Sequence, residues 1–328
     1  MKRILLIATG GTIASLPEEN GLVPAVTGEE LASRVPQLAD LCDLDVVQPM
    51  NIDSTNMHPS GWLAIARCIT DAYDGYDGFV VLHGTDTMAY TAAALSYLVQ
   101  GSRKPIVLTG SQQPMANPFT DAKLNLYQAV LYACDETSRD VCVVFDGHVI
   151  AGTRARKQRT MSFNAFTSVN YPDLAVIRSD RIVRPGGMAA PAETVLRTYE
   201  RLDERVVVMK LTPALSPTTF DLLRGTCDAL ILETFGIGGV PDSLRESVLG
   251  WADSGRAVIM TTQVPEEGLV LGVYEVGRPY AQHPGILRGR DMTTEALVAK
   301  TMWALGESHD PARVSELFDR PVNYDRLP

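Results

Sequence analysis

A short apolar run near the start of the chain limits the folds that this sequence can adopt. Residues 4–8 (ILLIA) lack the alternation of apolar and polar side chains that marks a strand with one face in water. Such a run is typical of a strand buried on both faces, as in a parallel sheet covered by helices. It ends at residues 9–12 (TGGT), where two glycines allow a sharp turn and leave backbone N–H groups accessible.

This turn does not match a dinucleotide-binding fingerprint, which would open directly into a helix. Residues 16–21 (LPEENG) follow instead, and we expect them to form a mobile loop. Taken alone, the segment fits either a ligand site at the carboxyl end of a buried strand or a plain polar turn that ends the strand.

The pattern of a buried strand followed by a helix recurs along the chain. Expected strands cover residues 45–47, 78–82, 105–108, 141–145, 206–209, 229–232 and 257–260. Expected helices cover residues 59–73, 88–99, 121–133, 218–224, 243–252 and 294–305, with a further short helix after a capping box at Thr27 and a hairpin turn at residues 146–147. Repeated units of this kind predict an α/β fold with a mainly parallel sheet, flanked by helices, in each of two domains.

The domain boundary is predicted from a break in this pattern. Residues 184–191 (RPGGMAAP) interrupt every periodicity, as a linker does. The predicted domains are therefore residues 1–184, the larger domain with flavodoxin-like layering, and residues 205–328, joined by a linker over residues 185–204.

Composition excludes several classes of protein. The formal net charge of −10 over 328 residues argues against a nucleic-acid partner or an anionic membrane surface. No apolar run reaches the ~18 residues of a membrane span, and the chain leads directly into a strand without a signal peptide, so we expect a cytoplasmic protein. The five cysteines are scattered, and neither they nor the histidines have metal-ligand spacing, so neither disulfides nor a metal is expected.

Polar side chains gather where the N-terminal strands are expected to end, which is where open parallel sheets bind ligands. These residues are Thr9 and Thr12, Asp53 and Ser54, His83, Thr85 and Asp86, and Ser111 and Gln112. Carboxylates suit an ammonium group, while hydroxyls and backbone amides suit a carboxylate, so the set fits a small zwitterion. A threonine could act as a nucleophile there only with a base nearby.

Two of these segments together resemble the signature of a known family. Residues 9–14 (TGGTIA) and 83–88 (HGTDTM) are similar to the paired motifs of the bacterial-type L-asparaginases. The resemblance runs the whole length, including residues 50–55 (MNIDST), 109–112 (TGSQ) and 289–293 (GRDMT), and it is to the cytoplasmic, type I-like branch. It implies hydrolysis of L-asparagine to L-aspartate and ammonia through a covalent acyl-threonine, without cofactor, in a homodimer or homotetramer.

Matched position by position, the resemblance makes Thr12 the nucleophile and Thr85, Asp86 and Lys157 a second catalytic group. A desolvated lysine can lose its proton near neutral pH, and it could then activate Thr85 or, through it, a water. Ser54 would hold the substrate α-carboxylate and Asp86 the α-ammonium. The implied substrate-binding set is Asp53, Ser54, Thr55, Thr85, Asp86 and Ser111. Asp53 could instead only cap a turn, and His83 is expected to be a buried structural imidazole.

Three positions depart from the family pattern. Leu22 stands where many relatives have a tyrosine, so the proton acceptor for Thr12 is either a water held by Thr9 and its neighbours or a relay through Thr85 to Lys157. Gly239 replaces an asparagine that relatives often have. Glu233 replaces the arginine of a regulatory asparagine site, so we do not expect that regulation here.

Two other functions compete with this interpretation. One is the related subunit that releases ammonia for tRNA-dependent amidation, which needs an additional N-terminal module that we do not expect in this chain. The other is a non-catalytic module that binds an amino acid or phosphate at the glycine turn. That module would leave the pairing of Thr85 with Asp86 unexplained.

Overall fold

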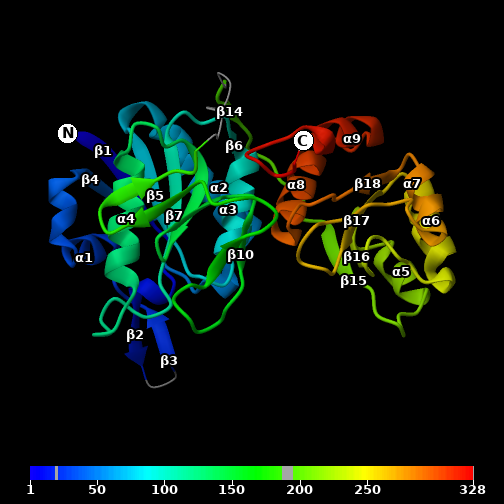
Figure 1. The fold of residues 1–328 in the computed structure, drawn as a ribbon, viewed down its shortest axis with the longest axis horizontal. Coiled ribbons are helices and arrows are strands. Elements are labelled where there is room, and N and C mark those ends of the chain that lie inside the picture. The colour runs from blue at the N-terminus through cyan, green and yellow to red at the C-terminus, as the bar shows by residue number, and fades with distance from the viewer. Residues whose placement is uncertain (19–20, 187–194, 328) are drawn as a thin grey trace. The chain divides into compact units, whose positions relative to one another are not determined.

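The computed structural model describes residues 1–18, 21–186 and 195–327, which form two units, Met1–Glu200 and Arg201–Pro328 (Figure 1). Residues 187–194 of the predicted linker lie outside the described residues. Nearer its end, strand β14 (Arg197–Thr198) pairs with β6 (Val99–Gln100), so this part of the predicted linker belongs to the N-terminal unit. Among the described residues, no helix combines the length and the apolar character needed to cross a bilayer.

The N-terminal unit is built around a mixed sheet. Its other strands are β1 (Lys2–Ala8), β2 (Ser15–Glu18), β3 (Gly21–Pro24), β4 (Cys42–Val47), β5 (Gly78–Leu82), β7 (Pro105–Thr109), β8 (Asp140–Phe145), β9 (His148–Ala151), β10 (Ala155–Lys157), β11 (Phe166–Ser168), β12 (Ala175–Arg178) and β13 (Arg181–Val183). Within the described residues, an eight-stranded sheet has the order β13-β12-β9-β8-β7-β5-β1-β4. Strands β4, β1, β5, β7 and β8 run parallel, whereas β9, β12 and β13 extend the sheet in antiparallel fashion.

Helices cover both faces of this sheet, which confirms the predicted layering (Figure 1). They are α1 (Gly28–Ser33), α2 (Pro59–Asp71), α3 (Met88–Leu98) and α4 (Ala122–Cys134). Helix α1 begins at the predicted capping box, in which Thr27 and Glu30 bond reciprocally to each other's backbone N–H. Helix α3 is buried almost all round, as its uniformly apolar sequence predicts.

Hydrophobic patterning accounts for the central strands, and local turn chemistry for their connections. Every residue of β5 is buried, because helices cover the sheet on both sides. Asp146 and Gly147 both have positive φ, 49° and 79°, and they join β8 to β9 in the predicted two-residue hairpin.

The loop expected at residues 16–21 is instead part of a hairpin. Strands β2 and β3 pair antiparallel, with Pro17 opposite Leu22, and residues 19 and 20 lie outside the described residues. The hairpin projects from the rest of the N-terminal unit (Figure 1). A two-stranded ribbon has free edges, so it tolerates prolines that a central strand would exclude. The prediction of an irregular loop was wrong because it treated the proline as a sign of irregular chain, whereas this ribbon accommodates it.

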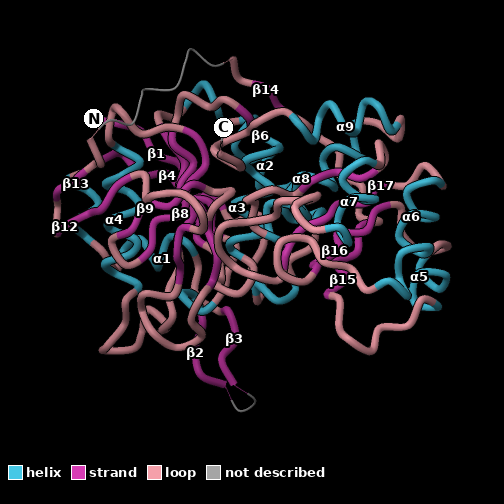
Figure 2. The backbone as a smooth tube through the Cα atoms, turned by 45° about the vertical axis from the view of Figure 1, so that its right-hand side comes forward, coloured by secondary structure: helices cyan, strands magenta, loops and turns pink. Residues whose placement is uncertain are grey.

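The C-terminal unit is a parallel sheet with helices on either side (Figure 2). Its strands, in spatial order, are β15 (Val206–Lys210), β16 (Ala229–Thr234), β17 (Ala257–Thr262) and β18 (Ile286–Arg288). Its helices are α5 (Thr218–Leu223), α6 (Arg245–Asp253), α7 (Arg278–Gln282), α8 (Thr294–Glu307) and α9 (Pro311–Asp319). Phe220, Trp251 and Tyr280 pack with the strands in its core. The predicted pair of α/β domains is therefore confirmed.

Candidate active site

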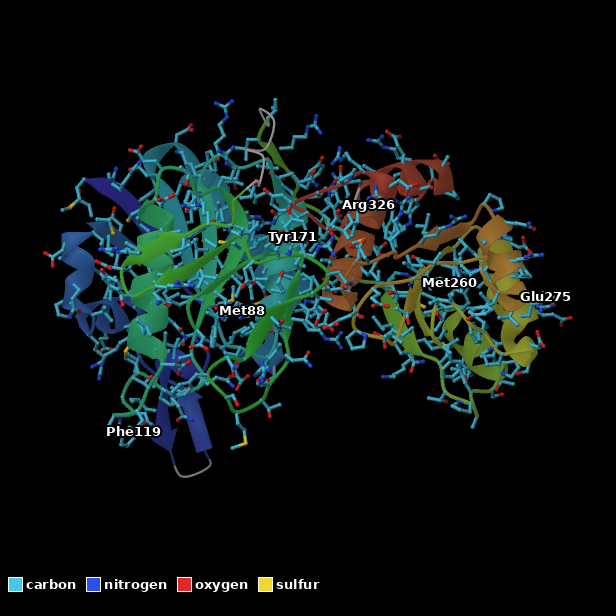
Figure 3. The ribbon with its side chains drawn as sticks, viewed as in Figure 1. Met88, Phe119, Tyr171, Met260, Glu275 and Arg326 are labelled. Atoms are coloured by element: carbon cyan, nitrogen blue, oxygen red, sulfur yellow. The ribbon has the colours of Figure 1, made fainter. Side chains whose placement is uncertain are left out.

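Glycine contacts bring four strand-end turns of the N-terminal unit together. A Cβ added at Gly11 would overlap the backbone of Gly84, and one added at Gly84 would lie 2.5 Å from Oγ of Ser54. A Cβ at Gly110 would overlap the carbonyl oxygen of His83 and lie 2.9 Å from Met88, at the start of α3 (Figure 3). The segments that follow β1, β4, β5 and β7 therefore touch through backbone that has no room for a side chain.

Backbone hydrogen bonds hold the first turn against the segment after β4. The N–H of Gly11 donates to the carbonyl of Ile52 (2.9 Å), and the N–H of Ile52 donates to that of Thr9 (3.0 Å). Gly10 and Gly11 have φ of 101° and 79°, a conformation that favours glycine. Two glycines are therefore required where the chain leaves β1 and enters the short 3₁₀ helix η1 (Thr12–Ala14).

His83 is fully buried and fixes the turn after β5. Its Nδ1 lies 2.7 Å from the carbonyl oxygen of Gly84, so Nδ1 carries the proton and donates. Its Nε2, 2.9 Å from the Thr91 hydroxyl, then accepts from that hydroxyl, which in turn accepts from the indole N–H of Trp62. Burial lowers the pKa of His83 to about 4, so the imidazole is neutral near pH 7. His83 is thus a structural residue, as predicted.

Lys157 joins Thr85 and Asp86 in space, although it lies more than 70 positions away in the sequence. Its Nζ donates to Oγ1 of Thr85 (2.8 Å) and to Oδ1 of Asp86 (2.6 Å). The side chain of Lys157 is only 17% exposed, whereas that of Asp86 is 56% exposed. The lysine reaches this position because β10 pairs with β11, with Lys157 opposite Phe166.

Gln112 contacts the same group, a role that sequence reasoning did not assign. The Thr85 hydroxyl donates to Oε1 of Gln112 (3.2 Å), and Nε2 of Gln112 donates to the carbonyl of Ser162 (3.1 Å). The backbone N–H of Gln112 donates to both carboxylate oxygens of Asp121. The sequence signal was its place at the end of β7, but the contact with Thr85 follows only from the folded loop.

The two threonines of the first turn have different surroundings. Thr9 is buried, and its hydroxyl donates to the carbonyl of Leu82 (2.8 Å). Thr12 is half-buried, and no partner for its hydroxyl lies among the residues that the structure describes. Both proton acceptors considered for Thr12, the water and the relay through Thr85, therefore stay predictions.

The segment after β4 places the predicted substrate-binding residues unequally. Asp53 is exposed, and its Oδ1 accepts from both the backbone N–H and the hydroxyl of Thr55 (2.8 Å each), which is a turn cap. Ser54 is buried next to Gly84, and its carbonyl accepts from the Thr87 hydroxyl (2.7 Å). Ser54 therefore lies against the turn that carries Thr85, whereas Asp53 caps the turn that contains Ser54.

The side chain of Ser111 bonds within its own loop. It is fully buried, and its hydroxyl donates to the carbonyl of Gln113 (2.5 Å). The part of this segment nearest Thr85 is therefore Gln112, and a substrate contact at Ser111 stays a prediction.

Two positions singled out in the sequence and one group of possible metal ligands lie in the C-terminal unit. Glu233 accepts a hydrogen bond from the Thr294 hydroxyl (2.7 Å), and Gly239 closes a tight turn with Phe235. Among the described residues, Asp203, Asp228 and His309 form a group that could hold a metal ion. However, the guanidinium of Arg205 already forms an ion pair with Asp228.

Comparison with known proteins agrees with this geometry. The model of the asparaginase N-terminal domain matches residues 3–185, and that of the glutaminase/asparaginase C-terminal domain matches residues 205–318. The chain is 36% identical to an L-asparaginase of Thermococcus kodakarensis, over 98% of each chain. It is 35% identical to a glutamyl-tRNA(Gln) amidotransferase subunit of Pyrococcus furiosus, over 94% of this chain and 73% of that protein.

A solved structure supports the same relationship over both units. The thermostable L-asparaginase from Thermococcus kodakarensis superposes with a TM-score of 0.91 and 34% identity, covering 99% of each chain. Because the family models match most of the sequence and the fold matches over its whole length, the resemblance seen in the two motifs is confirmed: the chain belongs to the asparaginase family.

Proposed function

We propose that this protein hydrolyses the side-chain amide of L-asparagine to L-aspartate and ammonia through an acyl intermediate on Thr12. The observation that carries the proposal is the position of Lys157, whose amino group bonds to both Thr85 and Asp86. This group lies beside the Gly11–Gly84 contact that adjoins Thr12. A nucleophile and a base system that activates hydroxyls can thus act on one carbonyl.

The chemistry divides into two steps. The Oγ1 of Thr12 attacks the amide carbonyl carbon, and backbone N–H groups near Thr12 and Thr85 stabilise the oxyanion that forms. The C–N bond then breaks, and ammonia leaves with a proton. In the second step a water attacks the ester carbonyl carbon, its hydroxyl becomes part of the released aspartate, and its other proton restores the hydroxyl of Thr12.

Proton transfer would run through Thr85. In the structure its hydroxyl accepts from Lys157 and donates to Gln112. To serve as a relay, this hydroxyl must rotate away from Gln112 and give its proton to Nζ of an uncharged Lys157. Asp86 keeps the lysine in place through the 2.6 Å contact.

Substrate recognition would use the opposite charges of the amino acid. Ser54 would bind the α-carboxylate, and the exposed carboxylate of Asp86 would bind the α-ammonium. Asp53 and Thr55 would support this end of the site by capping the turn that carries Ser54. Thr85 and Ser111 complete the proposed binding set.

The test is ammonia release from L-asparagine by the purified protein and by Thr12→Ala. Thr12→Ala is expected to fold normally and to lose several orders of magnitude in kcat. Thr70→Ala, which removes a hydroxyl bonded only to the backbone of α2, is the matched control and should keep the wild-type rate. Acid quenching followed by mass spectrometry should show an aspartyl adduct on Thr12. A Thr12→Ala enzyme that keeps near wild-type kcat would show that the nucleophile is another residue.

The similarity to an amidotransferase component supports one alternative, release of ammonia for a partner enzyme. Efficient turnover of free asparagine by the isolated chain would favour the proposed function, whereas turnover that needs a partner would favour the alternative. We further propose that the protein is cytoplasmic and that it forms a homodimer or homotetramer. Light scattering on the purified protein would test the oligomeric state.

A further inference from the structure

A buried carboxylate at the start of helix α4 binds the segment that follows β7. Asp121 is only 8% exposed, and its Oδ1 accepts from the backbone N–H groups of Gln112 (3.1 Å) and Gln113 (3.0 Å). Its Oδ2 accepts from the N–H of Gln112 (2.9 Å) and from Nδ2 of Asn125 (3.1 Å). In the part of the chain that the structure describes, no cation forms an ion pair with Asp121. A buried charge that only N–H groups satisfy calls for an explanation.

The start of helix α4 does not supply this explanation. An aspartate at the N-cap position usually accepts from backbone N–H groups in the first turn of its own helix. Asp121 occupies that position in α4, but its side chain forms no such bond. The N–H of Ala122 donates instead to the hydroxyl of Thr120 (3.0 Å). The carboxylate of Asp121 is therefore used outside its own helix, on the backbone at Gln112.

Asn125 holds the same segment from one turn further along α4. Residues four apart lie on one face of a helix, so Asn125 and Asp121 point the same way. The Nδ2 of Asn125 donates to the carbonyl of Gly110 (3.0 Å) as well as to Asp121. Gly110 is also packed so closely against His83 that a Cβ there would overlap its carbonyl oxygen. The segment is thus fixed between α4 and the turn after β5.

Gln112 extends this restraint to the candidate active site. Its Oε1 accepts from the hydroxyl of Thr85 (3.2 Å), and its Nε2 donates to the carbonyl of Ser162 (3.1 Å). Ser162 lies in the connection between β10, which ends at Lys157, and β11. One side chain therefore links the turn that carries Thr85 to the small sheet that carries Lys157.

We propose that Asp121 is a positioning residue for the candidate active site. It holds the backbone of Gln112 in place, so that the Gln112 side chain keeps Thr85 and Lys157 correctly placed relative to each other. The proposal rests on the proposed function, because it takes these two residues as the base system. Asp121 acts only through Gln112 and has no part in the proton transfer itself.

Asp121→Asn tests this role, because it keeps the size of the side chain and replaces one acceptor by a donor. Both carboxylate oxygens accept N–H groups, so an NH₂ group in either place would face a donor. We expect kcat for L-asparagine to fall about 10–100-fold, since a displacement of 1 Å can cost about 100-fold.

Asp135→Asn, at the other end of α4, is the matched control. The Asp135 carboxylate also accepts a backbone N–H, that of Thr137 (3.0 Å), and it pairs with Arg184. This variant should therefore lose stability but keep the wild-type kcat. Urea unfolding of both variants measures the stability loss separately from the kinetics.

Combination with Gln112→Ala separates positioning from a general structural role. Gln112→Ala should itself lower kcat, and adding Asp121→Asn should lower it little further, because the side chain that Asp121 positions is gone. Losses that multiply in the double variant would overturn the proposal. If Asp121→Asn does not fold, Asp121→Ser, which keeps one acceptor for the N–H of Gln112, takes its place in the same comparison.

A measurement without turnover keeps this test distinct from that of the proposed function. NMR of ¹³C-labelled threonine methyl groups should show a shifted Thr85 resonance in Asp121→Asn and in Gln112→Ala, but not in Asp135→Asn. A wild type that releases no ammonia from asparagine would overturn the proposed function alone. An unshifted Thr85 resonance in folded Asp121→Asn would overturn the positioning role whether or not the wild type is active, as would a wild-type kcat in this variant.

Discussion

Gly11 and Gly84, which lie in the turns after two neighbouring strands of one sheet, have their backbones in direct contact. Gly11 has φ of 79°, so both its conformation and its surroundings exclude a side chain. The contact joins the turn that carries Thr12 to the turn that carries Thr85. A small displacement here would therefore separate the proposed nucleophile from its proposed base system.

Gly11→Ala is accordingly expected to damage both stability and activity. The left-handed conformation and the overlap with Gly84 together should lower the free energy of unfolding by about 2–4 kcal/mol. We expect kcat/KM for asparagine to fall at least about 100-fold, since a misplacement of 1 Å can have that effect. Gly75→Ala is the matched control, because a Cβ there meets nothing within 4 Å. Denaturant unfolding and steady-state kinetics on both variants test this expectation, and an active Gly11→Ala would contradict it.

Lys157→Met is expected to reduce kcat by about 10²–10⁴-fold, because it removes the proposed base. It also removes the amino group that bonds to both Thr85 and Asp86. Lys123→Met, at an exposed position on α4, controls for the loss of a lysine.

Leu22→Ala should lower kcat at saturating asparagine far less than Lys157→Met does, because leucine cannot accept a proton. If Leu22→Ala lost most of its kcat and Lys157→Met stayed active, the relay through Thr85 would be wrong.

Because His83 is buried, we expect the folded protein to lose stability in acid. Its pKa is about 4 in the folded protein against 6.5 in the unfolded chain, so the unfolded chain takes up a proton first as the pH falls. The free energy of unfolding should therefore decrease between pH 6.5 and 4, by about 3 kcal/mol from this residue, and this contribution should be complete below pH 4.

Urea unfolding of the wild type and His83→Gln across this range would measure the effect. The variant should show a shallower decrease, whereas His58→Gln, at an exposed position, should follow the wild type. Parallel curves for the wild type and His83→Gln would show that the buried imidazole does not contribute.

Exhaustive dialysis against a chelator should leave the rate of asparagine hydrolysis unchanged. The proposed chemistry uses hydroxyls, a lysine and a carboxylate, and it assigns no step to a metal. The potential ligand group of Asp203, Asp228 and His309 lies in the other unit, with Asp228 held by Arg205. Asp203→Asn should therefore also retain the wild-type rate. A loss of activity that added divalent ions restore would contradict this prediction.

Much of the fold was predictable from local signals, whereas the details of the site were not. Uniformly apolar runs identify strands such as β5, and the capping box at Thr27 marks the start of α1. The two motifs also indicate the family, and hence Lys157. The Gln112–Thr85 bond and the direction of the Thr9 hydroxyl depend on how separate loops pack, which no local pattern encodes. The β2–β3 hairpin was missed because its prolines resemble irregular chain.

The small sheet that carries Lys157 affects how the protein would lose activity on heating. Strands β10 and β11 are three residues each, and within the described residues they form a separate two-stranded sheet outside the main one. Elements this small open far more readily than a buried central strand. Warming or mild denaturant should then displace Lys157 reversibly, while the core amides of β1 and β5 stay protected from hydrogen exchange. We therefore expect activity to be lost on heating below the temperature at which the N-terminal unit melts, because a few residues hold Lys157 in place.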